Sequence, residues 1–256
     1  MSERIEALKR KMDGKKLVKG VFINMGDPMV SEMAGFAGYD FVWIDAEHGP
    51  LGRQEILHHI MAAQGAGCAA IVRVPGPERT LVKAILDMGP DGIIFPFTNN
   101  KEIALEEIRA CSYPDEGGVR GQGPIRAIRY GLDDEAEYIA RAYREVFKIG
   151  QIETLEAYHN LDEILTVTGF DSFFIGAADM GRSIRGSGEA VDLDGVIDDV
   201  CRRVRMAGFY MGAAIAPAPA SAKRHMEAGV QWAVFGQDAR ILSSGLKANL
   251  DALKDF

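Results

Sequence analysis

The stretch Gly38-Tyr-Asp-Phe-Val-Trp-Ile-Asp-Ala-Glu-His-Gly-Pro50 contains the pattern on which the fold prediction depends. A glycine, which readily takes the left-handed conformation that ends a helix, precedes a polar residue and the apolar run 41–44. The run is continuous, as is typical of a strand buried on both faces. Three ionisable side chains follow it: Asp45, Glu47 and His48. Because charged groups rarely stay at the edge of a core unless they are paired, this strand ends in either an ion-pair cluster or an active site.

The same pattern occurs three more times, at residues 89–96, 169–175 and 229–235, and more loosely after Gly67 and Gly208. Two further apolar segments lie near the start and in the middle of the chain. We therefore predict eight strands, at 18–24, 41–45, 68–74, 92–97, 146–153, 172–178, 209–215 and 232–236. Helices are predicted at 3–12, 29–37, 53–64, 79–88, 101–111, 133–145, 154–166, 191–206, 219–228 and 238–254.

Buried strands that alternate with helices predict a parallel sheet covered on both faces. Eight such units in 256 residues favour a closed (β/α)8 barrel, the TIM barrel, over an open sheet. We expect one domain, 1–256, with the extra helix 3–12 covering the bottom of the barrel. The glycine- and arginine-rich segment 113–131 between the fourth and fifth strands is long enough to be a functional lid or an interface.

The composition excludes several classes of partner. A formal charge of −8 argues against nucleic acid or an anionic membrane surface. No apolar run approaches the ~18 residues of a transmembrane helix, and the charged first residues do not resemble a signal peptide. Three cysteines without a CxxC spacing predict reduced, buried thiols. We therefore expect a cytoplasmic protein with a small-molecule substrate.

In a TIM barrel the active site lies at the carboxyl ends of the strands. Glu153 and Asp179 follow the fifth and sixth predicted strands, which are neighbours in such a barrel. Two carboxylates held close together repel each other unless a cation lies between them, and oxygen ligands suit Mg²⁺ or Mn²⁺. The alternative is that both residues cap helices, and spacing alone does not separate the two interpretations.

His48 is the only histidine at the end of a predicted strand, so it is the candidate general base, with Asp45 placed to orient it. The alternative is a histidine that only caps a loop. Arg73 ends the third predicted strand, where a guanidinium suits a substrate carboxylate or a developing oxyanion. A salt bridge from Arg73 to Asp45 or Glu47 is equally compatible with its position.

Several motifs together resemble the class II, metal-dependent pyruvate aldolases, the group of 2,4-dihydroxyhept-2-ene-1,7-dioate aldolase, 2-dehydro-3-deoxyglucarate aldolase and macrophomate synthase. The resemblance runs from about residue 18 to 250 in the family's order. The motifs are Asp45-Ala-Glu-His-Gly-Pro50, Val72-Arg-Val-Pro75, Leu86-Asp-Met-Gly89, Arg120-Gly-Gln-Gly-Pro-Ile-Arg-Ala127, Gln151-Ile-Glu153, Asn160-Leu-Asp-Glu-Ile-Leu165 and Phe174-Ile-Gly-Ala-Ala-Asp179.

The resemblance implies a barrel enzyme that binds a divalent metal (Mg²⁺, Mn²⁺ or Co²⁺) through Glu153 and Asp179. Pyruvate would chelate this metal, with help from Gln151 and from the backbone near Gly176 and Ala178.

It further implies that His48 is the base, that Asp87 raises its basicity and that Arg73 stabilises the enolate. Similar enzymes are hexamers built from dimers that exchange their last helix, so a homo-oligomer is expected. Several positions depart from the family pattern. Ala177 stands where proline is usual, a serine is usual near Gly181, residues 182–185 are larger than is common, and Phe97 stands where a smaller or more flexible residue is commoner.

The sequence therefore predicts a carbon–carbon lyase that cleaves a 4-hydroxy-2-oxo acid to pyruvate and an aldehyde. Two alternatives stay open. One is an acyl-CoA lyase of the malyl- or citramalyl-CoA type, against which the −8 charge argues because its cofactor is a long anion. The other is a non-catalytic barrel that binds a metal and an oxo acid.

Overall fold

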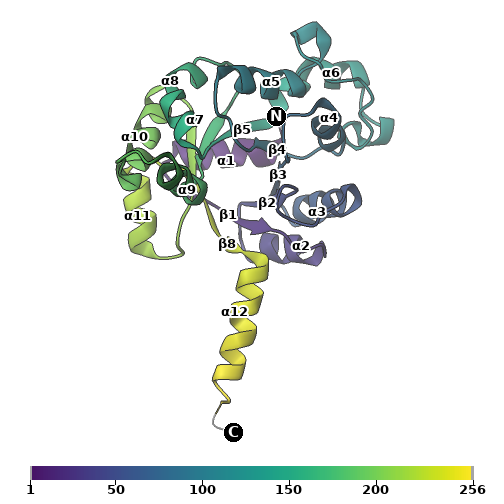
Figure 1. Cartoon of the computed structure of the whole chain (residues 1–256). Helices are drawn as coiled ribbons and strands as arrows, with labels where there is room; N and C mark the ends of the chain where they lie inside the picture. Colours follow the sequence, from purple (N-terminus) through teal and green to yellow (C-terminus); the bar gives the residue numbers. More distant parts are fainter. Residues whose placement is uncertain (1, 255–256) are drawn as a thin grey trace.

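Eight parallel strands form a closed barrel in the computed structural model, which describes residues 2–254. Each strand pairs with the next along the chain, and β8 pairs with β1 (Figure 1). Every predicted strand is confirmed to within three residues at each end. The strands are β1 (Val18–Ile23), β2 (Phe41–Asp45), β3 (Ala69–Arg73), β4 (Gly92–Phe95), β5 (Phe147–Ile152), β6 (Ser172–Ile175), β7 (Tyr210–Ala214) and β8 (Trp232–Gln237).

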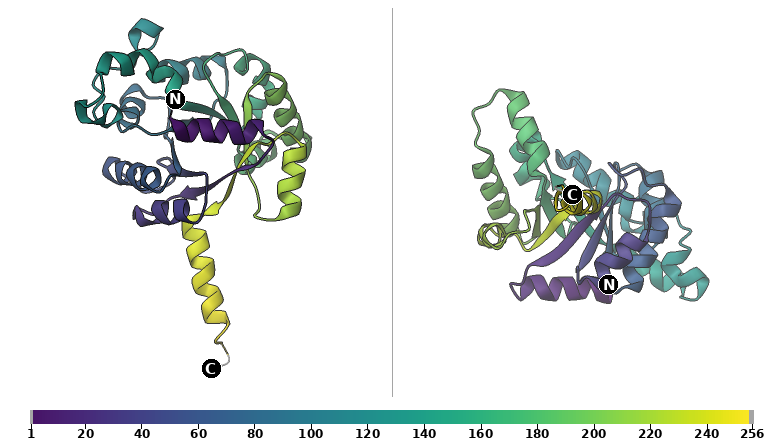
Figure 2. Two further views of the ribbon diagram at one scale, coloured as in Figure 1. Left: turned by 180° about the vertical axis from the view of Figure 1, so that it is seen from behind. Right: turned by 90° about the horizontal axis from the view of Figure 1, so that it is seen from below.

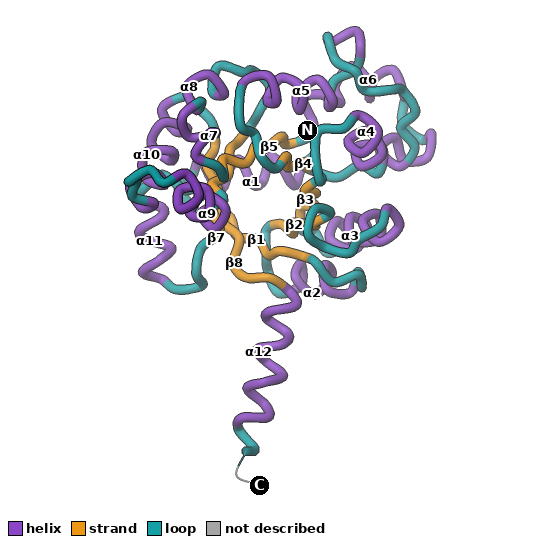
Figure 3. The backbone as a smooth tube through the Cα atoms, viewed as in Figure 1, coloured by secondary structure: helices purple, strands orange, loops and turns teal. Residues whose placement is uncertain are grey.

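Helices surround the barrel on its outer side (Figure 3). They are α1 (Glu3–Asp13), α2 (Met29–Phe36), α3 (Arg53–Gly65), α4 (Arg79–Asp87), α5 (Lys101–Cys111), α6 (Glu135–Glu145), α7 (Leu155–His159), α8 (Leu161–Ile164), α9 (Ala177–Ser187), α10 (Leu193–Met206), α11 (Pro219–Glu227) and α12 (Asp238–Asp251). Two short 3₁₀ helices, η1 (Pro114–Glu116) and η2 (Arg126–Gly131), lie in the glycine- and arginine-rich segment.

Inward-facing side chains fill the barrel. Phe41, Trp43 and Trp232 lie in the interior cluster, and the ring of Phe41 occupies the space that a Cβ on Gly20 would need. Helix α1 contributes Ile5, Leu8 and Met12 to the same cluster, so it covers the amino ends of the strands as predicted. Of the two ends of the barrel, the carboxyl end is the one left open for a site.

Two elements differ from the prediction. Residues 154–166 form two short helices, α7 and α8, because Asn160 ends the first and its side chain donates to the carbonyl oxygen of Asn99 at 3.0 Å. Helix α9 has no counterpart among the predicted helices, and its first two residues fall in the predicted strand 172–178. It begins immediately after β6, with Gly176 as its N-cap.

Helix α12 projects away from the barrel (Figures 1 and 2). Asp238 is its only buried residue. Its exposed apolar side chains are Ile241, Leu242, Leu246 and Leu250, and Leu253 follows the helix. The three cysteines are buried and form no disulfide. Within residues 2–254 none of the helices has the length and apolar character needed to cross a membrane.

Candidate active site

Asp45 and Arg73 form the centre of the barrel mouth. They pair in register on β2 and β3, and both lie on the inward-facing side of their strands. The guanidinium binds the carboxylate with two hydrogen bonds, from Nε to Oδ1 at 3.0 Å and from Nη2 to Oδ2 at 2.7 Å. The face of Trp43 lies below, with its ring 5.4 Å from the Arg73 guanidinium carbon. The predicted salt bridge is therefore present.

Further hydrogen bonds fix Asp45. The amide of Asn24 donates to Oδ2 at 3.0 Å, and the backbone N–H groups of Glu47 and His48 donate to Oδ1 at 3.2 Å. Burial alone would raise the pKa of Asp45, but the charge and hydrogen bonds of Arg73, together with these donors, lower it below the ordinary value. Asp45 is therefore a fixed anion.

Arg73 also links this pair to the other acidic residues. Its Nη1 lies 2.8 Å from Oε2 of Glu47 and donates to Oε1 of Gln151 at 3.4 Å. Gln151 in turn donates from Nε2 to Oε2 of Glu153 at 3.0 Å. Residues from β2, β3 and β5 thus form one continuous polar network across the mouth.

Glu153 is the most perturbed acid of the mouth. It is only 2% exposed, and its Oε1 accepts the backbone N–H of Phe97 at 2.9 Å. Burial raises its pKa to about 7, and the negative charges of Glu47 and Asp179 add to this rise while Arg73 and the Phe97 N–H oppose it. A Cβ at position 176 would lie 2.6 Å from Oε2 of Glu153, so only glycine leaves the carboxylate its space.

Asp179 reaches the same region from the first turn of α9. Its charge raises the pKa of both Glu47 and Glu153, although burial is the larger cause for each. The predicted backbone contacts, Gly176 and Ala178, are the N-cap and an exposed residue of this first turn. The first N–H groups of a helix have no acceptor within the helix and attract anions.

The donor set of the mouth fits a hard divalent cation. Three carboxylates, Glu47, Glu153 and Asp179, interact electrostatically there. Burial raises the pKa of Glu47 and Glu153, and their mutual repulsion adds to the rise although Arg73 opposes it, so a further cation would be favourable. Among residues 2–254, no three His, Cys, Asp or Glu side chains are already arranged as a complete metal site. Glu153 and Asp179 would therefore act with water or substrate oxygens.

His48 lies at the rim, with its side chain 64% exposed and Nε2 4.0 Å from Oε2 of Glu47. Asp45 contacts the backbone N–H of His48 and not its ring. Asp87 was the expected partner of His48, but its Oδ1 accepts a hydrogen bond from Arg120 at 3.0 Å. Asp87 is the last residue of α4, where the chain turns toward the amino end of β4. His48 follows the carboxyl end of β2, which is the opposite end of the barrel. Within one described chain the two residues share no hydrogen bond or ion pair.

The structure also contains the second salt bridge considered from the sequence, with Nη1 of Arg73 2.8 Å from Oε2 of Glu47. The backbone N–H of Phe97 was missed because no side-chain pattern signals it. Phe97 has φ of 54°, in the left-handed region that residues other than glycine seldom adopt. This backbone conformation is visible only in the structure.

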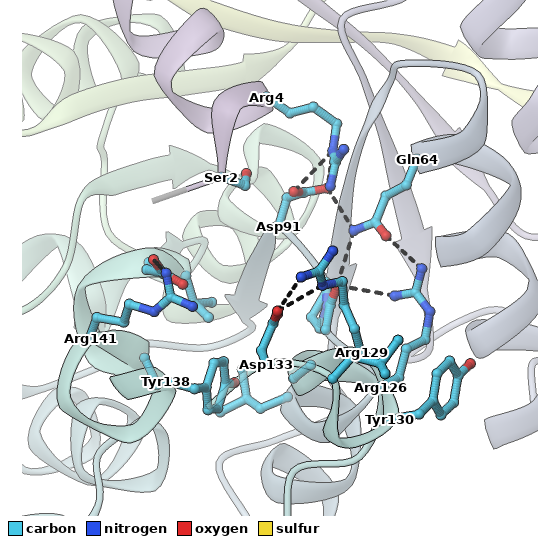
Figure 4. A pocket seen from close by; sticks show the side chains of 18 residues that line it. Ser2, Arg4, Gln64, Asp91, Arg126, Arg129, Tyr130, Asp133, Tyr138 and Arg141 are labelled. Atoms are coloured by element: carbon cyan, nitrogen blue, oxygen red, sulfur yellow. Dashed lines mark hydrogen bonds and ion pairs between the residues drawn. The ribbon is translucent and has the colours of Figure 1, made fainter. Parts of the chain in front are cut away.

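A cavity of about 630 Å³ lies elsewhere, between α1, η2 and α6 near the start of β4 (Figure 4). It contains four arginines, but each already has a partner. Arg4 binds Asp91, Arg126 binds Gln64 and two backbone carbonyls, Arg129 binds Asp133, and Arg141 binds Glu145. None of the candidate catalytic or metal-binding residues lines it, so the barrel mouth remains the candidate active site.

Comparison with known proteins places the chain among aldolases. The family model described as HpcH/HpaI aldolase/citrate lyase matches residues 19–244. The 4-hydroxy-2-oxovalerate aldolase of Rhodococcus jostii (strain RHA1) is 32% identical over 252 residues, 97% of this chain and 96% of that protein. The hydroxypyruvate/pyruvate aldolase of Roseovarius nubinhibens is 32% identical over 236 residues, 91% of each chain. A solved HpcH/HpaI aldolase/citrate lyase family protein from Burkholderia cenocepacia superposes with a TM-score of 0.87 at 26% identity, covering 97% of this chain and 99% of that one.

Proposed function

The chain belongs to the HpcH/HpaI aldolase/citrate lyase family, and we propose that it cleaves a 4-hydroxy-2-oxo acid to pyruvate and an aldehyde at the mouth of its barrel. It is a carbon–carbon lyase, and the reaction is reversible as an aldol addition. The observation that carries the proposal is Glu153. A buried carboxylate with a pKa of about 7, facing two further acids and a fixed guanidinium, suits a cation and a 2-oxo acid.

Glu153 and Asp179 would hold the divalent metal, Mg²⁺, Mn²⁺ or Co²⁺. When bound, such an ion supplies Lewis-acid polarisation of the 2-oxo group. Gln151 holds one oxygen of Glu153 and so orients that carboxylate. The N-terminus of α9 faces the same region. The N–H of Gly176 donates to the carbonyl oxygen of Ile152 at 3.1 Å, so the N–H groups of Ala177 and Ala178 are the ones offered to the substrate carboxylate.

Arg73 stabilises the charge that develops on the 2-oxo oxygen when the bond between C3 and C4 breaks. The electron pair of that bond moves toward C2 and gives the pyruvate enolate, while C4 leaves as the aldehyde. Arg73 is held for this role by Asp45 and by the ring of Trp43 beneath it, so little reorganisation is needed.

His48 takes the proton of the 4-hydroxyl group, directly or through a water molecule. In the reverse direction it removes a methyl proton from pyruvate. Its exposure at the rim lets it exchange protons with solvent between turnovers. Its basicity would rise beside a carboxylate, and the resemblance assigns this role to Asp87. Because Asp87 lies at the other side of its own barrel, we propose that His48 and Asp87 meet between subunits.

A homo-oligomer is part of this proposal. The projecting helix α12 exposes a stripe of apolar side chains that a second copy would cover, consistent with dimers that exchange this helix and assemble into a hexamer. The specific aldehyde is chosen by residues at the rim, among which Phe97 exposes part of its ring.

Exchange of the pyruvate methyl protons with D₂O tests the proposal without knowledge of the aldehyde. Followed by NMR, exchange should require both the protein and a divalent metal, and should stop in Glu153→Gln. A panel of aldehydes with pyruvate and Mg²⁺, Mn²⁺ or Co²⁺ then identifies the acceptor. Tight binding of pyruvate without exchange would support the non-catalytic barrel, and binding of coenzyme A would support an acyl-CoA lyase.

A further inference from the structure

Glu107 is a buried acid that the proposed reaction does not use. It lies on the inner face of α5 with no exposed surface. Both carboxyl oxygens face the hydroxyl of Thr98, at 3.1 and 3.0 Å, and Thr98 is their only hydrogen-bond partner within the described chain. Burial raises the pKa of Glu107 well above its usual value. A buried acid whose hydrogen bonds within the described chain all go to one hydroxyl fixes the position of that hydroxyl.

Thr98 is fixed at its other side by the barrel. It is fully buried, and its backbone N–H donates to the carbonyl oxygen of Gln151 at 3.1 Å. On β5, a Cβ at Gly150 would lie 2.9 Å from the Thr98 hydroxyl, so the strand leaves room for this side chain. Thr98 is therefore held between α5 and β5.

The neighbouring residue is strained. Phe97 has φ of 54°, in the left-handed region that residues with a Cβ seldom adopt, and this conformation directs its N–H to Oε1 of Glu153 at 2.9 Å. Such a conformation is unfavourable and persists only when its surroundings enforce it. Without the hydrogen bond between Thr98 and Glu107, the backbone at Phe97 would relax toward negative φ. The Phe97 N–H would then turn away from Glu153.

We infer that Glu107 and Thr98 are positioning residues for the metal ligand Glu153: their hydrogen bond locks Phe97 in its strained conformation and so keeps the Phe97 N–H on the Glu153 carboxylate. This inference rests on the proposed role of Glu153 in holding the metal. The acid on α5 thus acts on the mouth through Thr98 and the backbone of Phe97, without touching substrate or metal.

The test measures Mn²⁺ affinity of the metal-free protein by titration calorimetry. Replacing both buried partners by apolar groups of similar shape, in Thr98→Val/Glu107→Met, removes the tie with little loss of stability. We expect the affinity of this double variant to fall about 10–100-fold, the usual effect of losing a group that orients a metal ligand. Glu107→Gln keeps the size and a hydrogen bond to Thr98, and should stay within about threefold of the wild type. Thermal unfolding checks that each variant is folded.

A second background isolates the strain. Phe97→Gly retains the N–H and adopts positive φ without cost. The double change Thr98→Val/Glu107→Met should therefore weaken Mn²⁺ binding less in the Phe97→Gly background than in the wild-type background. If the double variant binds Mn²⁺ as the wild type does while Glu153→Gln is weakened, Glu107 and Thr98 are packing residues only and the inference is wrong. If Glu153→Gln itself binds as the wild type does, the proposed metal site is wrong.

Discussion

Arg73 contacts Asp45, Glu47, Gln151 and the ring of Trp43 at once. The bidentate bond to Asp45 fixes the orientation of the guanidinium, so the remaining nitrogen is directed at the acidic side of the mouth. Lysine would supply a similar charge but not this planar fork. The geometry of the mouth therefore depends on the planar shape of the Arg73 guanidinium as well as on its charge.

Replacing Arg73 by alanine should lower kcat by about 10²–10³, the effect of losing an oxyanion donor. The loss should exceed that of Arg73→Lys, which retains a cation. Steady-state kinetics of cleavage measures both, with thermal unfolding as the control because Asp45 loses its buried partner. Full activity of Arg73→Ala would contradict the assigned role.

The raised pKa of Glu153 makes the stability of the metal-free protein depend on pH. Its ordinary value is 4.5 and its folded value about 7, so the folded state binds this proton more tightly. The resulting stabilisation is complete below about pH 4.5 and is lost as the pH rises through 7. The side chain in Glu153→Gln does not titrate. The free energy of unfolding of this variant minus that of the wild type should therefore be larger at pH 8 than at pH 5, by up to about 3 kcal/mol. Urea unfolding without metal at both pH values measures this, and an equal difference at both would contradict the raised pKa.

At the scale of single elements, α9 is the helix closest to the proposed chemistry. It starts directly at the mouth, it carries Asp179 in its first turn, and its N-cap Gly176 packs against Glu153. Its position is set by β6, from which it continues after a single residue. The start of α9 and the side chain of Glu153 therefore have to fit each other closely.

Gly176→Ala should disturb this fit. The new Cβ would lie 2.6 Å from both Cβ and Oε2 of Glu153, so the carboxylate must move. We expect metal affinity and kcat to fall at least about tenfold, as for a displaced metal ligand. Gly186→Ala is the matched control on the same helix, because its Cβ meets nothing within 4 Å. That control should keep its activity and gain up to about 1 kcal/mol of stability. Equal activity of the two variants would sink the argument.

The sequence predicted the strands well because each buried strand is a continuous apolar run after a glycine. Asp45, Arg73 and Glu153 follow from that pattern, because the fold places strand ends together. Helix α9 was missed because Gly181 and Gly186 lower its helix propensity, although Gly181 is the residue that lets α10 approach through Leu193. The link from Glu107 to Glu153 passes through a backbone N–H, which no side-chain pattern reveals.

At the scale of the whole molecule, α12 carries apolar surface that the described chain leaves uncovered. Leu242, Leu246 and Leu250 recur every four residues and form one exposed apolar stripe. Water-exposed apolar stripes of this kind usually mark an interface.

Leu246→Glu/Leu250→Glu should shift the protein to a smaller species in sedimentation velocity, because the charges would be buried at the interface. Ala248→Glu, on the other side of the helix, is the control and should leave the assembly unchanged. If the double variant sediments like the wild type, α12 does not hold the subunits together.

The proposed meeting of His48 and Asp87 between subunits predicts complementation. His48→Ala and Asp87→Asn should each be nearly inactive alone, while co-expressed subunits should recover a measurable fraction of the wild-type kcat. Some mixed contacts then join an intact His48 to an intact Asp87. The control is co-expression of His48→Ala with a His48→Ala/Asp87→Asn double variant. No subunit of that mixture carries an intact His48, so no activity should be recovered. Absence of recovery in purified mixed oligomers would show that the two residues do not act together across a subunit contact.

Both tryptophans of the chain, Trp43 and Trp232, lie in the interior of the barrel with their ring centres 6.3 Å apart. One of them lies directly beneath the guanidinium of Arg73. The tryptophan fluorescence of the protein therefore comes from the floor of the mouth and the layer beneath it. An oxo acid that arrives above Arg73 changes the electric field at an indole, so its binding becomes an optical signal that needs no label.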